Sequence, residues 1–134
     1  MEEERVTRHQ NNTIISNINK LCNRNLVSKE YKDSYSDSKY GDLIEDGRNV
    51  ELIHGVSGKK NDSFFASKTK MRNSTCDEFL VWIGYDSNVL RVYSIPRTEV
   101  LEMISSGNVN YELGSQSKNQ GYRISLNHQY KINP

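Results

Sequence analysis

The sequence predicts a domain of the α/β class, mixed α+β in composition, with a central mixed sheet flanked by helices. The first observation is FLVWIGY, residues 79–85, a continuous apolar run of strand length that is typical of a strand covered on both faces. The second is that helix signals lie before residue 24 and after residue 95, with β-rich segments between them. A chain of 134 residues is long enough for one core and too short for two. We therefore expect a single domain, 1–134.

The elements are expected in the order helix, two strands, an unassigned piece, two strands, helix, strand. Residues 1–23 predict the first helix, because Ile14, Ile18 and Leu21 recur at helical spacing and give a narrow apolar stripe. Residues 24–40 are rich in Ser, Asp, Lys and Tyr, and this composition favours a loop.

The motif-bearing core is expected over residues 41–104. A hairpin occupies 40–53, and the segment 64–78 is ambiguous between a short strand and a helical turn. Residues 79–95 predict a second hairpin whose first strand is central in the sheet. Pro96 is expected at the first position of a short helix, where its missing N–H costs nothing.

The C-terminal region, 105–134, is predicted to be a loop followed by a strand. Tyr122, Ile124 and Leu126 alternate with polar residues, which is the pattern of a half-buried strand.

The composition leaves the class of partner open. A net charge of +1 neither favours nor excludes nucleic acid. Cys22 and Cys76 lie far apart and form no CxxC motif, which argues against a structural zinc site or a redox motif. There is no apolar run of about 18 residues and no signal-peptide pattern, so the sequence predicts a soluble, cytoplasmic protein with no membrane partner.

Two acidic residues are predicted to face each other in the first hairpin. If Asp46 and Gly47 form a two-residue turn, opposed positions sum to 93 and Asp42 lies opposite Glu51. Their Cβ atoms would be about 4.5–5.5 Å apart, and like charges at that distance are destabilising. A bound Mg²⁺ would reverse the penalty, because one or two carboxylates commonly hold this ion. The alternative is a surface hairpin whose acids lie in water.

Four segments in this order resemble the restriction-endonuclease-like, or PD-(D/E)XK, nuclease family. They are YGDLIEDGRNVELIHG, KKNDSFFASKTKMR, DEFLVWIGYD and LRVYSIPRTEVLEMI. The resemblance spans about residues 40–104. Members of the family typically carry an acid at the start of a hairpin and a Glu-x-Lys on its second strand, followed by a central apolar strand. Here Asp42 corresponds to the acid, Glu51 to the glutamate, and Ile53 stands at the position of the motif lysine.

The resemblance implies a DNA endonuclease of the type II restriction-enzyme kind, in which Asp42 and Glu51 bind Mg²⁺, and in which Mn²⁺ or Ca²⁺ can substitute for binding. It also implies a lysine that positions the attacking water and stabilises the developing charge. Ile53 can do neither. The replacement of the motif lysine by Ile53 therefore bears on DNA cleavage and not on the fold. If Ile53 occupies the catalytic position, Ile53→Lys is expected to create or increase cleavage.

Three accounts of Ile53 remain open. In the first, a lysine from elsewhere takes the catalytic role, with Lys59 and Lys60 closest in sequence. Lys68 and Lys70 come next. In the second, the protein is an inactive descendant of a nuclease. In the third, Ile53 is a substitution introduced to trap a complex.

The densest basic region follows the first hairpin. Lysine and arginine suit phosphate contacts, and asparagine can also read base edges. The candidate DNA-binding residues are Lys59, Lys60, Lys68, Lys70, Arg72 and Asn73. The alternative is a solvated surface face.

The first functional hypothesis is a Mg²⁺-dependent endonuclease that acts on double-stranded DNA as a homodimer, each chain cutting one strand of a two-fold site. The second is a non-catalytic DNA-binding protein on the same scaffold. The third is a small protein-interaction or inhibitor protein in which Asp42 and Glu51 are surface acids.

Overall fold

The computed structural model describes residues 2–29, 43–73, 75–107, 109–112 and 120–134. One sheet consists of β1 (Val27–Ser28), β2 (Leu43–Glu45), β3 (Arg48–His54), β5 (Glu78–Tyr85) and β6 (Asn88–Pro96). A second consists of β4 (Asp62–Ser67), β8 (Gly121–Leu126) and β7 (Asn110–Glu112). The α-helices are α1 (Glu2–Cys22), α3 (Lys68–Asn73) and α4 (Arg97–Ser106), and a 3₁₀ turn, His128–Tyr130, follows β8.

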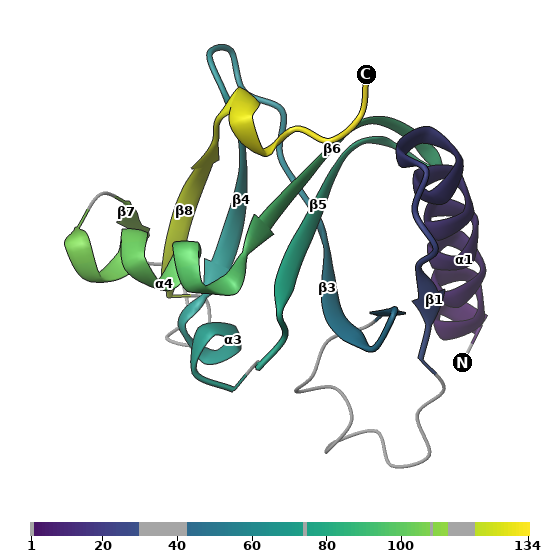
Figure 1. The fold of residues 1–134 in the computed structure, drawn as a ribbon, viewed down its shortest axis with the longest axis horizontal. Coiled ribbons are helices and arrows are strands. Elements are labelled where there is room, and N and C mark those ends of the chain that lie inside the picture. The colour runs from purple at the N-terminus through teal and green to yellow at the C-terminus, as the bar shows by residue number, and fades with distance from the viewer. Residues whose placement is uncertain (1, 30–42, 74, 108, 113–119) are drawn as a thin grey trace.

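The predicted mixed α+β fold with a central mixed sheet is confirmed. The main sheet has five strands in the order β1-β2-β3-β5-β6, and the second has three in the order β4-β8-β7. Figure 1 shows α1 on one side of the main sheet and the second sheet with α4 on the other. Within the described part of the chain, no helix is long and apolar enough to cross a membrane.

β5 is covered on both faces, as its apolar run predicts. It pairs in parallel with β3 and antiparallel with β6. Leu80 and Trp82 belong to the core that includes α1, whereas Phe79 and Val81 belong to the core that includes the second sheet. Since successive strand residues point to opposite faces, a strand between two cores needs apolar residues at every position.

The first helix buries a wider stripe than the spacing predicts. Ile14, Ile15 and Ile18 are all buried against the main sheet. Leu21, which was expected on the stripe, is 37% exposed, because the last turn of α1 borders a surface groove described below.

The predicted turn and register of the first hairpin are confirmed as far as the described residues extend. Asp46 and Gly47 have φ values of 49° and 80°, and this pair of positive angles is what a type I′ turn requires. The paired residues are Leu43 with Val50, Ile44 with Asn49 and Glu45 with Arg48. Each pair sums to 93.

The ambiguous segment contains both a strand and a helix. β4 runs to Ser67, and α3 begins at Lys68. The Ser67 hydroxyl accepts the Lys70 backbone N–H at 3.0 Å, which satisfies one of the unpaired donors in the first helical turn. Met71 is buried in the core beneath the second sheet and anchors α3 there.

α4 begins one residue later than predicted. Pro96 is the last residue of β6 and has an extended conformation, with φ −60° and ψ 141°. The helix ends at Gly107, whose φ of 77° lies in the left-handed region that favours glycine. The predicted C-terminal strand is confirmed as β8, in which Ile124 and Leu126 are buried.

The middle of the outer edge of β6, around Val92, is covered by residues 131–133. The Ile132 N–H donates to the Val92 carbonyl at 2.9 Å, and Asn133 Oδ1 accepts the Val92 N–H at 2.9 Å. Covering an edge in this way removes a template for pairing with other strands.

A buried carboxylate, Asp62, connects the two sheets. Arg91 donates to it from Nε at 2.6 Å and from Nη2 at 3.1 Å, and the Tyr93 hydroxyl donates at 2.6 Å. The hydrogen bond from Arg91 is the main reason that the pKa of Asp62 is lowered. Burial, together with the bond to Asp62, raises the pKa of Tyr93 to about 12.

Tyr93→Phe is expected to lower the free energy of unfolding by about 1.5–3 kcal/mol at neutral pH, the usual contribution of a hydrogen bond to a charged group. A raised pKa adds stability that is complete below the unfolded value of about 10 and is lost as the pH rises toward the folded value. Urea unfolding at about pH 7 and about pH 11 should therefore show a smaller loss of stability in Tyr93→Phe than in the wild type. Equal losses of stability in the two proteins between these pH values would contradict a raised pKa of Tyr93 in the folded state.

Candidate active site

Glu51 is a buried carboxylate on β3 that is paired with a lysine from a different element. Only 7% of the residue is exposed. Lys70 Nζ lies 3.0 Å from Glu51 Oε1, and 35% of the lysine side chain remains exposed. The pair therefore joins a buried acid to a cation that reaches solvent. Removing one member of such a pair leaves the other charge poorly compensated.

The chain direction explains how Lys70 reaches Glu51. β3 and β5 are parallel, and Glu51 is opposite Phe79, near the start of β5. α3 comes shortly before β5, so it lies at the same end of the sheet. Because Met71 is buried and Ser67 caps the first turn, the packing of α3 determines where Lys70 emerges.

Ile53 lies on the same face of β3 as Glu51, as residues two apart on a strand must. It is 9% exposed and belongs to the apolar core formed with Phe64, Phe79 and others. The side chain at the motif-lysine position is therefore part of the core. The lysine that the structure pairs with Glu51, Lys70, comes from α3.

Asp42 lies outside the described residues, and its position opposite Glu51 stays a prediction. The described register ends at Leu43 opposite Val50, one residue short of the acidic pair.

A second lysine lies along the same face of β3. Lys29 Nζ is 2.8 Å from the side-chain oxygen of Asn49, which is two residues before Glu51. The Asn49 backbone N–H donates to Asp77 Oδ2 at 2.8 Å, and its carbonyl accepts the Asp77 N–H at 2.9 Å. Sequence reasoning missed Lys29 and Asn49. Because residues 49, 51 and 53 alternate along a strand and share one face, the sequence could have placed Asn49 beside Glu51. No local pattern indicates that Lys29 lies near them.

An ion-pair network on the opposite face of the sheet holds the hairpin against β5. Arg24, just after α1, contacts Glu45 at 2.7 Å and Glu78 at 3.2 Å. Arg48 contacts Glu78 at 3.0 Å, and Ser94 also donates to Glu78. The hydrogen bonds from Arg24 lower the pKa of Glu45. Glu78 is only 2% exposed, and sequence reasoning did not identify it as a member of any polar cluster.

The six candidate DNA-binding residues fall into two groups at opposite ends of β4. Lys59 and Lys60 are exposed in the connection between β3 and β4, which Figure 1 shows at the far end of the domain from α3. They are therefore not near Glu51. Lys68, Lys70 and Arg72 lie on α3, as does Asn73, whose side chain is outside the described part of the chain.

Glu51 supplies the described carboxylate on which metal binding at this site would depend. Among the described residues there is no group of three or more His, Cys, Asp or Glu side chains that could hold a metal. Mg²⁺ usually retains several waters and is held by only one or two carboxylates. A single buried carboxylate is compatible with that coordination, and the predicted position of Asp42 would supply the second.

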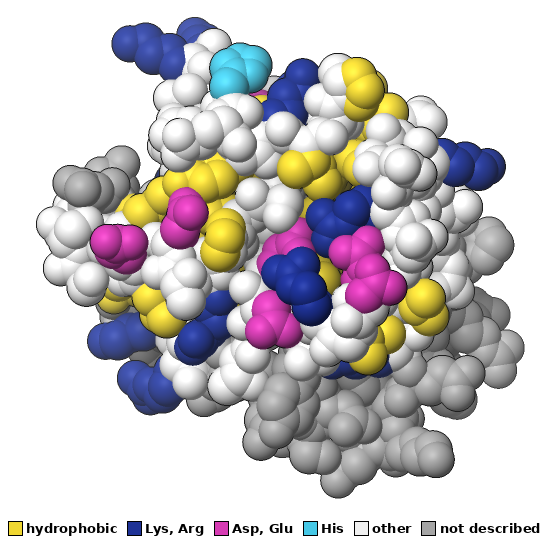
Figure 2. All heavy atoms as spheres, viewed as in Figure 1, with side chains coloured by type: hydrophobic (Ala, Val, Ile, Leu, Met, Phe, Trp, Pro, Cys, Tyr) yellow, Lys and Arg dark blue, Asp and Glu magenta, His cyan; other side chains and the backbone are white. Residues whose placement is uncertain are grey.

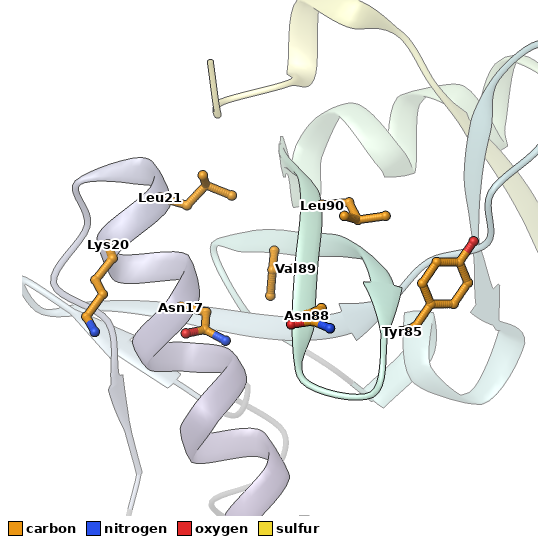
Figure 3. A pocket seen from close by; sticks show the side chains of 7 residues that line it. All are labelled: Asn17, Lys20, Leu21, Tyr85, Asn88, Val89 and Leu90. Carbon is orange, nitrogen blue, oxygen red and sulfur yellow. The ribbon is translucent and has the colours of Figure 1, made fainter.

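A groove of about 630 Å³ lies between the end of α1 and the β5–β6 hairpin (Figure 3). Its lining residues are Asn17, Lys20, Leu21, Tyr85, Asn88, Val89 and Leu90. No acidic side chain is among them, and the α1 side of the sheet is the face opposite Glu51. The groove is therefore separate from the Glu51 site.

In comparisons with known proteins, no protein-family model matches the chain, and no curated protein is significantly similar to it.

Proposed function

We propose that the chain is a Mg²⁺-dependent endonuclease that acts on double-stranded DNA, as its resemblance to the restriction-endonuclease-like family implies. The observation that carries the proposal is the 3.0 Å contact between Lys70 Nζ and Glu51 Oε1. It supplies, from α3, the carboxylate and ammonium pair that the family normally carries within Glu-x-Lys. Of the three accounts of Ile53, this contact favours the one in which a lysine from elsewhere takes the role.

Lys70 has the properties that the role requires. Its ammonium carries three donors on a flexible stem, so it can contact Glu51 and a substrate phosphate together. Because about a third of the side chain is exposed, a phosphate can approach from solvent. A positive charge at this point stabilises the negative charge that develops on the phosphate during hydrolysis.

Glu51 and Asp42 are the residues that would hold Mg²⁺. When bound there, the ion would polarise the scissile phosphate and lower the pKa of a coordinated water. Burial of Glu51 limits its competing contacts with bulk water, and Lys70 balances its charge until the ion is present. A homodimer would place one such site on each strand of a two-fold DNA sequence.

The proposal is tested by incubating plasmid DNA with the wild-type protein and with Glu51→Gln, in Mg²⁺ and in Mn²⁺. We expect cleavage by the wild type, and a loss of at least about 100-fold in the variant, since a ligand to the ion is removed. In parallel, Ca²⁺ should raise the melting temperature of the wild type but not of Glu51→Gln, because only a specific ligand of the native state shifts the midpoint.

Each other outcome has a definite meaning. DNA binding without cleavage in either metal would replace the proposal with a non-catalytic DNA-binding protein. Neither DNA binding nor a metal-dependent melting shift would favour the protein-interaction alternative.

A further inference from the structure

The segment from the end of β3 to the end of α3, which includes β4, carries many more basic than acidic side chains. Residues 55–73 include five basic side chains, Lys59, Lys60, Lys68, Lys70 and Arg72, and a single acidic one, Asp62. Asp62 is buried and is bound by Arg91 and Tyr93. The exposed charge of this segment is therefore entirely positive.

The positive charge is divided between the two ends of β4. In Figure 2, basic side chains project at the top, where Figure 1 shows the β3–β4 connection, and gather again at the lower left, over α3. Within the described part of the chain, neither Lys59 and Lys60 at one end nor Lys68 and Arg72 at the other form an ion pair. These four cations are available to an external anion.

The connection that carries Lys59 and Lys60 has a defined shape. Its base is closed by two backbone hydrogen bonds between Val56 and Ser63, at 2.7 and 2.9 Å. Arg91 donates to the Ser57 hydroxyl at 3.2 Å, and the Gly58 backbone contributes a hydrogen bond to Asp62. The buried Asp62 network therefore positions the two lysines, so that less conformational entropy is lost when they bind.

Between the two basic groups lies the outer face of the second sheet. The register places Ser63 opposite Ser125 and Phe65 opposite Arg123. These positions alternate with the buried Phe64 and Ile124, so they point away from the core. The Arg123 guanidinium lies 5.5 Å from the centre of the Phe65 ring. Serine hydroxyls and arginine are common phosphate-contacting groups.

We infer that a DNA duplex lies along β4, with its phosphate backbone contacted by α3 at one end and by the β3–β4 connection at the other. The inference rests on the proposed function and names the surface that holds its substrate. The five residue steps of β4 span about 17 Å at a rise of about 3.3 Å. That length is close to half a helical turn of B-DNA, which repeats every 34–36 Å or so. One end of the duplex would then lie beside Lys70 and Glu51.

The test measures the binding of a duplex of about 20 base pairs by fluorescence anisotropy, in Ca²⁺ and over a range of salt concentrations. We expect Lys59→Ala and Lys60→Ala each to weaken binding and to reduce the slope of log K against log salt by about 0.9, the value for one phosphate contact. Lys20→Ala is the matched control. It removes the same charge from an exposed lysine in the groove beside α1, and it should leave the slope unchanged.

The results separate this inference from the proposed function. The wild type could bind and cut duplex DNA while Lys59→Ala and Lys60→Ala behave like Lys20→Ala. In that case the surface along β4 does not bind the duplex, and the nuclease proposal stands. If the wild type binds no DNA, both are overturned. If it binds only single-stranded DNA of the same sequence, the duplex is the wrong occupant and the inference is likewise overturned.

Discussion

Lys70→Met is expected to slow DNA cleavage by about two to three orders of magnitude, the usual loss when one group that stabilises transition-state charge is removed. The reason is the 3.0 Å contact with Glu51, which places the ammonium beside the expected metal and phosphate. Methionine keeps much of the length and apolar character of the lysine stem but carries no charge. The measurement is the single-turnover cleavage rate at saturating DNA and Mg²⁺, with the folded fraction matched by circular dichroism.

Lys68→Met is the matched control for this prediction. It lies on the same short helix and loses the same charge, but of these two lysines it is Lys70 that forms the ion pair with Glu51. We expect Lys68→Met to weaken DNA binding without a comparable loss of rate at saturation. Equal rate losses in the two variants would mean that α3 contributes only general electrostatic attraction.

Lys70→Met should also bind divalent metal more tightly than the wild type. The ammonium of Lys70 competes with a cation for Glu51 Oε1, so its removal favours Ca²⁺ or Mg²⁺ at that oxygen. Tighter metal binding together with slower cleavage would not be expected if Lys70 served only to stabilise the fold. Isothermal titration with Ca²⁺ provides the measurement.

Ile53→Lys is expected to lower the free energy of unfolding by about 3–5 kcal/mol, as for an uncompensated charge in a core. Ile53 is 9% exposed and packs with Phe64 and Phe79, so the ammonium would lose water without gaining an opposite charge, since Glu51 is already paired with Lys70. This burial also reverses the expectation from the sequence that Ile53→Lys would increase cleavage. Because Lys70 already supplies an ammonium beside Glu51, we expect no gain in rate.

The pH dependence distinguishes a buried lysine from a simple packing defect. Burial lowers the folded pKa of a lysine, so between that lowered value and the unfolded value of about 10.4 the unfolded state binds more protons than the folded state, and stability rises with pH. The deficit of Ile53→Lys relative to the wild type should therefore shrink between about pH 7 and about pH 10.

Ile53→Met serves as the volume-conserving control and should cost less than about 1.5 kcal/mol at every pH. If Ile53→Lys proved as stable as Ile53→Met and also cut DNA faster than the wild type, position 53 would be the catalytic lysine position after all.

Local sequence patterns were sufficient to predict those features that depend on neighbouring residues alone. Asp46 and Gly47 tolerate positive φ, so they predicted both the turn and the register that follows from it. The apolar run at 79–85 predicted a strand covered on both faces, because alternation is absent only where both faces are buried. Glu51 was singled out from the same hairpin, and the fold class followed from the order of these elements.

The tertiary structure alone decided which charges meet. Lys70 and Glu51 are separated by a turn, a strand and the start of a helix, and their contact depends on Met71 anchoring α3 in the core. The pairing of Arg24 with Glu78 likewise joins the end of α1 to the start of β5. Long flexible side chains carry no local signal of their partners, since many lysines and arginines are within reach of any acid until packing fixes the backbone. The sequence by itself therefore predicted the fold class and the first hairpin with its glutamate, and only the packed fold decided the second sheet and which lysine lies beside Glu51.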